Sequence, residues 1–137
     1  MANATLNLTH GRQNPLVAIQ SITFDQIADT GVAVDVVKLP VGAVVTGGYY
    51  TVLSAATGLT SQTIDLDLGT AKLVNDADNE AAAGTTVAFT AASCGKAPLT
   101  AAGYVTITPT TVGTATGGSY QVVVEYIIDG RASEAQP

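Results

Sequence analysis

Apolar and polar residues alternate along much of the chain with the period of two that is typical of β-strands. Residues 63–68, TIDLDL, show this most clearly, because three aliphatic side chains fall on one face and Asp65 and Asp67 on the other. The pattern predicts a strand with one face in the core and one in solvent.

The run VAVDVVKLPVGAVVTGGYYTVL, residues 32–53, is the longest apolar stretch of this kind. It is dense in valine and tyrosine, which suit a pleated and half-buried surface. Pro40 lacks a backbone donor and Gly42 tolerates unusual backbone angles, so the run predicts two strands joined by a turn. Gly47 and Gly48, inside the second strand, predict a bulge or a tight bend.

Other candidate strands fall in residues 16–27, 71–74, 86–90, 104–108 and 119–128. The last of these is apolar on both faces, so we expect it to be central or to meet another chain. The Thr-, Ser- and Gly-rich segments 54–62 and 109–118 are expected to be loops, and residues 79–84, NEAAAG, a helical turn.

About eight short strands predict one all-β domain, a jelly-roll-like β-sandwich. We place this domain at residues 16–130. Residues 1–15 form a polar N-terminal arm in front of it, and residues 131–137 a polar C-terminal tail.

The chain has few charges: 12% of its 137 residues, about half the usual share. Either much of the surface is covered in an assembly, or Thr, Ser and Asn keep it hydrated. Five basic residues and a net charge of −6 exclude a positive patch for nucleic acid or an anionic membrane. The N-terminus has no signal-peptide pattern and Cys94 has no disulfide partner, so synthesis in a reducing cytoplasm is expected.

No catalytic site and no cofactor are predicted. His10 is the only histidine and sits in the polar arm, and Cys94 has no histidine near it in sequence to activate it. Asp65 and Asp67 share a strand face and would not flank a substrate as a glycosidase pair does.

The acidic run Asp76, Asp78 and Glu80 spaces oxygens at every second residue, as in calcium-binding loops. It lacks the glycine that the full calcium-loop pattern requires, because Ala81 follows, so a solvated loop is preferred and calcium stays the alternative. The paired tyrosines Tyr49 and Tyr50 leave open a carbohydrate-binding surface, although the chain has no tryptophan.

Three segments, DVVKLPVGA within the long run, SQTIDLDLG and the C-terminal YQVVVEYIIDGRASEAQP, resemble small head proteins of tailed phages. These are the cement or decoration proteins that bind the outside of a capsid. The resemblance covers the chain from about Leu16 to its end and rests on a strand pattern and a turn.

The resemblance implies a non-enzymatic virion protein on the capsid exterior, assembled in the host cytoplasm, that stabilises contacts between major capsid subunits. It also implies a homo-oligomer, with a dimer favoured over a trimer. A tail or fibre component and a carbohydrate-binding module are the alternatives. The residues expected to contact the capsid or another subunit are Leu6, Leu8, Tyr49, Tyr50, Val123 and Ile127.

Overall fold

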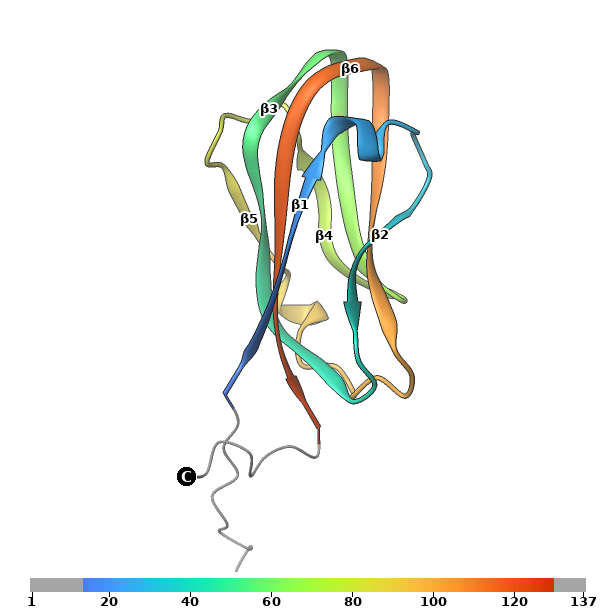
Figure 1. Cartoon of the computed structure of the whole chain (residues 1–137), viewed down its shortest axis with the longest axis vertical. Helices are drawn as coiled ribbons and strands as arrows, with labels where there is room; N and C mark the ends of the chain where they lie inside the picture. The colour runs from blue at the N-terminus through green and yellow to red at the C-terminus, as the bar shows by residue number, and fades with distance from the viewer. Residues whose placement is uncertain (1–13, 130–137) are drawn as a thin grey trace, which may run out of the picture.

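The computed structural model describes residues 14–129, and six β-strands dominate this part of the chain (Figure 1). Two short 3-10 helices, η1 (Phe24–Ile27) and η2 (Ala91–Ser93), lie between strands. The strands are β1 (Leu16–Thr23), β2 (Val34–Leu39), β3 (Ala43–Leu68), β4 (Ala71–Asp78), β5 (Thr86–Ala88) and β6 (Gly103–Ile128).

Strands β3 and β6 are each 26 residues long and run antiparallel from the Ala43–Ile128 pair to the Leu68–Val105 pair. Both strands bend over together at one end of the molecule, where they form an arch (Figure 1). One sheet is thereby folded into two layers. The register shifts between Val45 and Gly47, which confirms the predicted irregularity at the paired glycines.

The arch gives each layer two central segments, one from β3 and one from β6. In the first layer β1 pairs with the C-terminal half of β6, and β5 with the N-terminal half of β3. In the second layer β2 pairs with the N-terminal half of β6, and β4 with the C-terminal half of β3.

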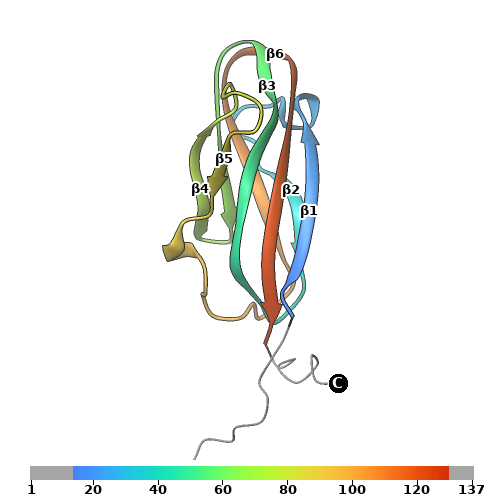
Figure 2. The ribbon, with the colours of Figure 1, turned by 90° about the vertical axis from the view of Figure 1, so that its left-hand side faces the viewer.

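Numbered along the chain, these eight segments have the order 1-8-3-6 in the first layer and 2-7-4-5 in the second. This is the strand order of a jelly roll. The predicted all-β sandwich is therefore confirmed. Figure 2 shows β1 and β6 side by side in the first layer, with β4 displaced to the opposite side of the molecule.

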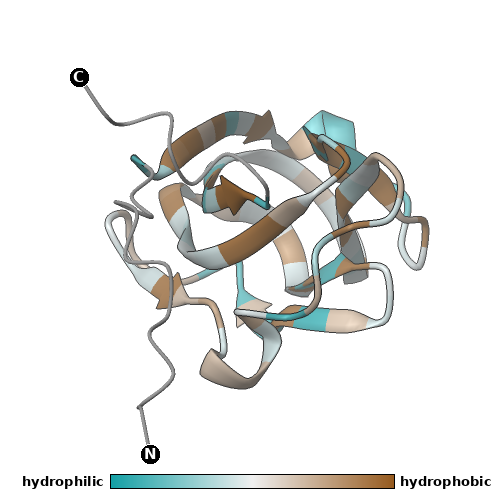
Figure 3. Cartoon of the chain, turned by 90° about the horizontal axis from the view of Figure 1, so that it is seen from below, coloured by the Kyte–Doolittle hydropathy of each residue, from teal (hydrophilic) through white to brown (hydrophobic). Residues whose placement is uncertain are grey.

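The core lies between the two layers. Figure 3, a view from below, shows the strands around this core, and hydrophobic and hydrophilic residues alternate along the strands. Side chains from both layers form a single buried cluster. Its members include Val45, Tyr50, Val52, Ile64, Leu66, Leu73, Val105, Ile107, Tyr120 and Val122.

Two expectations about loops are wrong. Residues 54–62 and 109–118 belong to β3 and β6, and they pair with each other over the arch, as at Thr57–Gly117 and Ser61–Val112. Their Thr, Ser and Gly content suggested loops, but long-range pairing overrides a weak local preference. Residues 79–84 contain turns and no helix, so the helical turn is also wrong.

Gly58 makes the bend possible. Its φ of +85° lies in a region that side chains disfavour, and a Cβ there would come within 2.4 Å of Thr116 Oγ1. A residue with a side chain would both strain the backbone and push the two bent segments apart.

A buried polar network links the layers below the arch. The Tyr50 hydroxyl on β3 donates to Asn79 Oδ1, and Asn79 Nδ2 donates to Gln62 Oε1 at 2.7 Å. Gln62 Nε2 then donates to Thr111 Oγ1 at 2.8 Å. Asn79 and Gln62 are 0% and 1% exposed, so each of these side chains depends on the others for its hydrogen bonds.

Tyr120 stacks on Tyr50, with ring centroids 6.0 Å apart. Burial raises the pKa of Tyr120 to about 12. Burial and the neighbouring Tyr120 also raise the pKa of Tyr50, against the opposing effect of its hydrogen bond to Asn79. Both phenols are therefore neutral at physiological pH, and Tyr50 acts as a donor.

We expect Asn79→Ala to lower the free energy of unfolding by about 3 kcal/mol, because it leaves the Tyr50 hydroxyl and Gln62 Oε1 buried without partners. The matched control is Asn75→Ala, since Asn75 lies on β4 and is exposed. Urea unfolding measures both. An Asn79→Ala cost no larger than that of the control would show that the network does not stabilise the fold.

Candidate interaction surface

The outer face of the first layer carries a row of apolar residues that crosses all four strands. Ile19 on β1 is level with Val123 on β6, Val123 with Tyr49 on β3, and Tyr49 with Ala88 on β5. Ile19 is 60% exposed and Tyr49 41%. We call Ile19, Val123, Tyr49 and Ala88 the apolar row.

Val123 shows that this row is separate from the buried core. It is only 7% exposed, yet it does not belong to the buried core cluster, which contains its neighbours Val122 and Val124. Because side chains alternate along a strand, Val123 points away from the core, between Ile19 and Tyr49.

The apolar surface extends beyond the row. Val17 and Leu53 are 54% and 43% exposed, and Ile127 is partly buried beside Val44 on the next strand. Thr51 and Thr86, whose hydroxyl oxygens are 3.1 Å apart, border the row on one side. The surface formed by the apolar row with Val17, Leu53 and Ile127 is called the apolar face below.

Among the described residues of this face of the sheet, the one charged side chain is Glu125. It lies level with Val17 and accepts a hydrogen bond from Thr46 Oγ1 at 3.0 Å. Apolar side chains with few charges are typical of the fully buried centre of a protein interface.

The outer face of the second layer is different in character. The equivalent row across its four strands is Asp35, Thr106, Asp67 and Lys72. Three of these four residues are charged, whereas none of the four in the apolar row is. The sandwich therefore has one apolar and one charged outer face.

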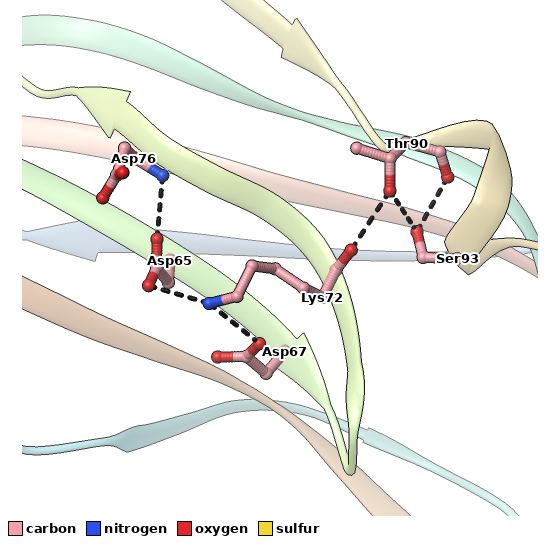
Figure 4. A network of polar contacts seen from close by, with 6 residues as sticks. All are labelled: Asp65, Asp67, Lys72, Asp76, Thr90 and Ser93. Carbon is pink, nitrogen blue, oxygen red and sulfur yellow. Dashed lines mark hydrogen bonds and ion pairs between the residues drawn. The ribbon is translucent and has the colours of Figure 1, made fainter.

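Lys72, on the edge strand β4, pairs with two carboxylates of the charged face (Figure 4). Its Nζ lies 2.9 Å from Asp65 Oδ2 and 3.5 Å from Asp67 Oδ1. Partial burial raises the pKa of Asp65, but hydrogen bonds from Lys72 and from the Asp76 backbone N–H outweigh it, so this pKa lies below its ordinary value. Asp65 and Asp67 thus pair with a lysine, an arrangement unlike two carboxyls that face each other across a cleft.

The three residues of the acidic run make separate contacts in the structure. Asp76 and Asp78 lie on β4, where Asp78 Oδ1 accepts from the Glu80 backbone N–H at 2.8 Å. Glu80 Oε1 instead accepts from the Gln62 N–H at 2.9 Å. Within residues 14–129 no three His, Cys, Asp or Glu side chains are placed to hold a metal ion together.

An open cleft of about 620 Å³ lies between the start of β3, the β3–β4 turn and the segment around η2. Small apolar residues line most of it, together with Lys72 and Lys96. Thr90 and Ser93, also on its wall, hydrogen bond to each other at 2.8 Å (Figure 4). Cys94 is partly buried and packs against the core, which suits a filler residue.

The structure separates the contact residues expected from the sequence. Tyr49, Val123 and Ile127 lie on the apolar face. Tyr50 is 0% exposed, so its expected role in a contact surface is corrected, because the neighbour of an outward residue on a strand points inward. Leu6, Leu8 and His10 lie outside the described residues.

Sequence reasoning missed Val17, Ile19 and Leu53. The sequence of β1 did carry an indication of an outer apolar surface, because LVAI is apolar on both faces of the strand, as residues 119–128 are. The sequence did not show which strands lie side by side, so the row itself was not predictable.

In the described part of the chain, no helix is long and apolar enough to cross a membrane.

The sequence matches no protein-family model, and it matches no curated protein. Solved structures are similar along nearly the whole chain. A chain in the capsid asymmetric unit of cyanophage Pam1 is 24% identical with a TM-score of 0.65, and the match covers 93% of this chain and 94% of that one.

A chain in the capsid of Ralstonia phage GP4 is 18% identical with a TM-score of 0.56, over 93% of this chain and 91% of that one. One in the acidic stable capsid of Helicobacter pylori bacteriophage KHP30 is 14% identical with a TM-score of 0.55, over 85% and 90%. At these identities the likeness is one of fold, and it shows that this chain has the fold of chains found in three phage capsids.

Proposed function

We propose that the protein is a structural component of a phage virion that binds the outside of the capsid through its apolar face. The observation that carries this proposal is the contrast between the two outer faces of the sandwich. The apolar face would be covered by the capsid, and the face that contains Asp35, Asp67 and Lys72 would remain in solvent. The fold shared with chains of three phage capsids supports the virion setting.

The physical basis of binding is the burial of apolar surface. Ile19, Tyr49, Val17 and Leu53 are each more than 40% exposed, so they have surface to lose to a partner. Tyrosine offers a large contact area with few rotatable bonds, and such residues often dominate interface energies. Because a shell repeats its subunits, weak contacts at each copy add up over many positions.

The major capsid protein is the proposed partner, with contacts between its subunits stabilised from outside and assembly in the host cytoplasm. The net charge of −6 disfavours a position against the packaged DNA, whose backbone is also negative. The arm, residues 1–15, is proposed to add a strand to a capsid edge, where main-chain hydrogen bonds would contribute affinity.

The two alternative functions have less support. A carbohydrate-binding surface would have used Tyr49 and Tyr50 together, but Tyr50 is buried. No observation favours a tail or fibre component.

Co-sedimentation of the purified protein with capsids of its own phage tests this function. We expect saturation at about one copy per major capsid subunit, because a protein that stabilises subunit contacts must repeat with them. Quantitative gel densitometry of the pelleted capsids gives the ratio of this protein to the major capsid protein. Absence from the shell, or only a few copies in each particle, would contradict the proposal and favour a tail component.

The docking face is tested by a matched pair of substitutions. Tyr49 and Tyr104 are 41% and 44% exposed, and they point outward from opposite layers. Tyr49→Ser should weaken capsid binding about tenfold or more, because it removes the largest side chain of the apolar face. Tyr104→Ser should leave binding unchanged.

Titration of each variant against a fixed amount of capsid measures both affinities. Thermal unfolding of the free proteins checks that neither substitution has disturbed the fold. If Tyr104→Ser weakened binding and Tyr49→Ser did not, the second layer would be the docking face.

A further inference from the structure

The open cleft beside η2 gathers positive charge in an acidic chain. Residues 14–129 contain three basic side chains, Lys38, Lys72 and Lys96, and the last two line the cleft. No acidic residue of this part of the chain lines it. Because the whole chain has a net charge of −6, most of its surface repels an anionic group, and the cleft is where that repulsion is weakest.

Lys96 supplies the positive charge that a ligand could use. The ammonium group of Lys72 already lies 2.9 Å from Asp65 and 3.5 Å from Asp67, and Figure 4 shows it directed toward these carboxylates and away from Ser93. Lys96 is exposed and forms no ion pair with any residue of the described part. An incoming carboxylate can therefore pair with Lys96 without displacing an existing partner.

Hydrogen bonds to β3 fix one wall of the cleft. Gly95 N–H donates to Val45 O at 2.8 Å, and Leu99 N–H donates to Ala43 O at 3.1 Å. The chain advances four positions between these two contacts while β3 advances two, whereas a regular antiparallel partner would match the strand residue for residue. Residues 96–98 therefore cannot follow the edge of β3 closely, and this mismatch leaves the space of the cleft.

The other wall is fixed by Thr90, which holds η2 against β4. The Thr90 N–H donates to Leu73 O at 2.9 Å, and its Oγ1 donates to Lys72 O at 3.1 Å. Ser93 Oγ donates to Thr90 O at 2.7 Å. Each hydroxyl thus has a carbonyl acceptor within the wall, so these residues shape the cleft and leave Lys96 to attract an anion.

The cleft is continuous with the apolar face. Val44 lines the cleft and lies level with Ile127, which belongs to that face. The small side chains of Ala43, Ala71 and Ala92 also line the cleft and leave room for apolar atoms of a guest. A partner that covers the apolar face therefore reaches the cleft at its border.

We infer that the cleft receives a segment of the major capsid protein that carries an aspartate or glutamate, whose carboxylate pairs with Lys96 while apolar neighbours contact the alanine-lined wall. This inference rests on the proposed function, because it takes the capsid protein as the partner. The volume of about 620 Å³ lies within the usual range of ligand sites. The apolar face supplies contact area, and the charge pair fixes the orientation of the partner.

Substitutions of Lys96 test the charge pair. Lys96→Gln should weaken capsid binding about threefold, as expected for an exposed ion pair, and Lys96→Glu about tenfold or more, because it adds repulsion. Lys96→Arg keeps the charge and should bind like the unmodified protein. The control Lys38→Gln removes the same charge from β2, where Lys38 lies over the Tyr104 ring, and should leave binding unchanged.

Salt gives a second readout of the same pair. Added salt screens an exposed charge pair but does not weaken apolar contacts in this way. Capsid binding by the unmodified protein should therefore fall as the salt concentration rises, and binding by Lys96→Gln should fall less. Equal salt dependence of the two proteins would contradict a carboxylate at Lys96.

Carbodiimide cross-linking of the protein mixed with capsids of its own phage identifies the source of the carboxylate. The reagent joins an amine to a nearby carboxylate as an amide, and mass spectrometry locates the joined residues. The Lys72–Asp65 pair, 2.9 Å apart, is the internal positive control. We expect Lys96 to be joined to an aspartate or glutamate of the major capsid protein. Lys96 joined only to carboxylates of this chain, or to none while Lys72 reacts, would overturn the inference.

Two results separate the cleft contact from docking of the apolar face. Capsid binding that Tyr49→Ser weakens and Lys96→Glu leaves unchanged would overturn the cleft contact alone. Absence of binding by the unmodified protein would overturn the proposed function and the cleft contact with it. Thermal unfolding of each free variant checks that its fold is intact.

Discussion

The antiparallel pairing of β3 with β6 is the interaction on which the rest of the fold depends. The two strands remain paired over 26 residues each, through several register shifts and over the arch. Every other strand pairs with one half of β3 or β6. If the pair did not bend near Gly58, the two halves could not face each other, and no core would form between them.

This arrangement also explains how one chain presents two unlike outer surfaces. Each half of β3 supplies one residue to a row of its own layer: Tyr49 in the first and Asp67 in the second. Both strand halves bury their inward side chains in the same core, so the difference in polarity is confined to the outside. In the proposed function the apolar face would lose its water to the capsid, while the charged face would keep its water.

Local patterns in the sequence predicted much of the fold. The alternation in TIDLDL and the turn at Pro40 and Gly42 correspond to real features of β3 and of the β2–β3 connection. The arch was not predictable, since residues 54–62 and 109–118 become strands only by pairing with each other. For the same reason the sequence identified Tyr49 and Val123 as contact candidates but could not place Ile19 beside them.

The error at Tyr50 has the same origin. Two adjacent tyrosines suggested one aromatic surface, but adjacent residues on a strand face opposite ways, and Tyr50 joins the buried network with Asn79 and Gln62. The sequence alone did not show which of the two pointed outward. The side became clear only once Val122 and Val123, level with Tyr50 and Tyr49, were placed inside and outside the core.

Hydroxyl-radical footprinting of the protein, free and mixed with capsids of its own phage, tests the proposed docking face most directly. Oxidation of each side chain reports its contact with water and is read by mass spectrometry. If the apolar face docks, Ile19, Tyr49 and Leu53 lose reactivity on the capsid while Tyr104 keeps it. Unchanged reactivity of the first three, with protection of Tyr104, would contradict the assignment of the apolar face as the docking surface.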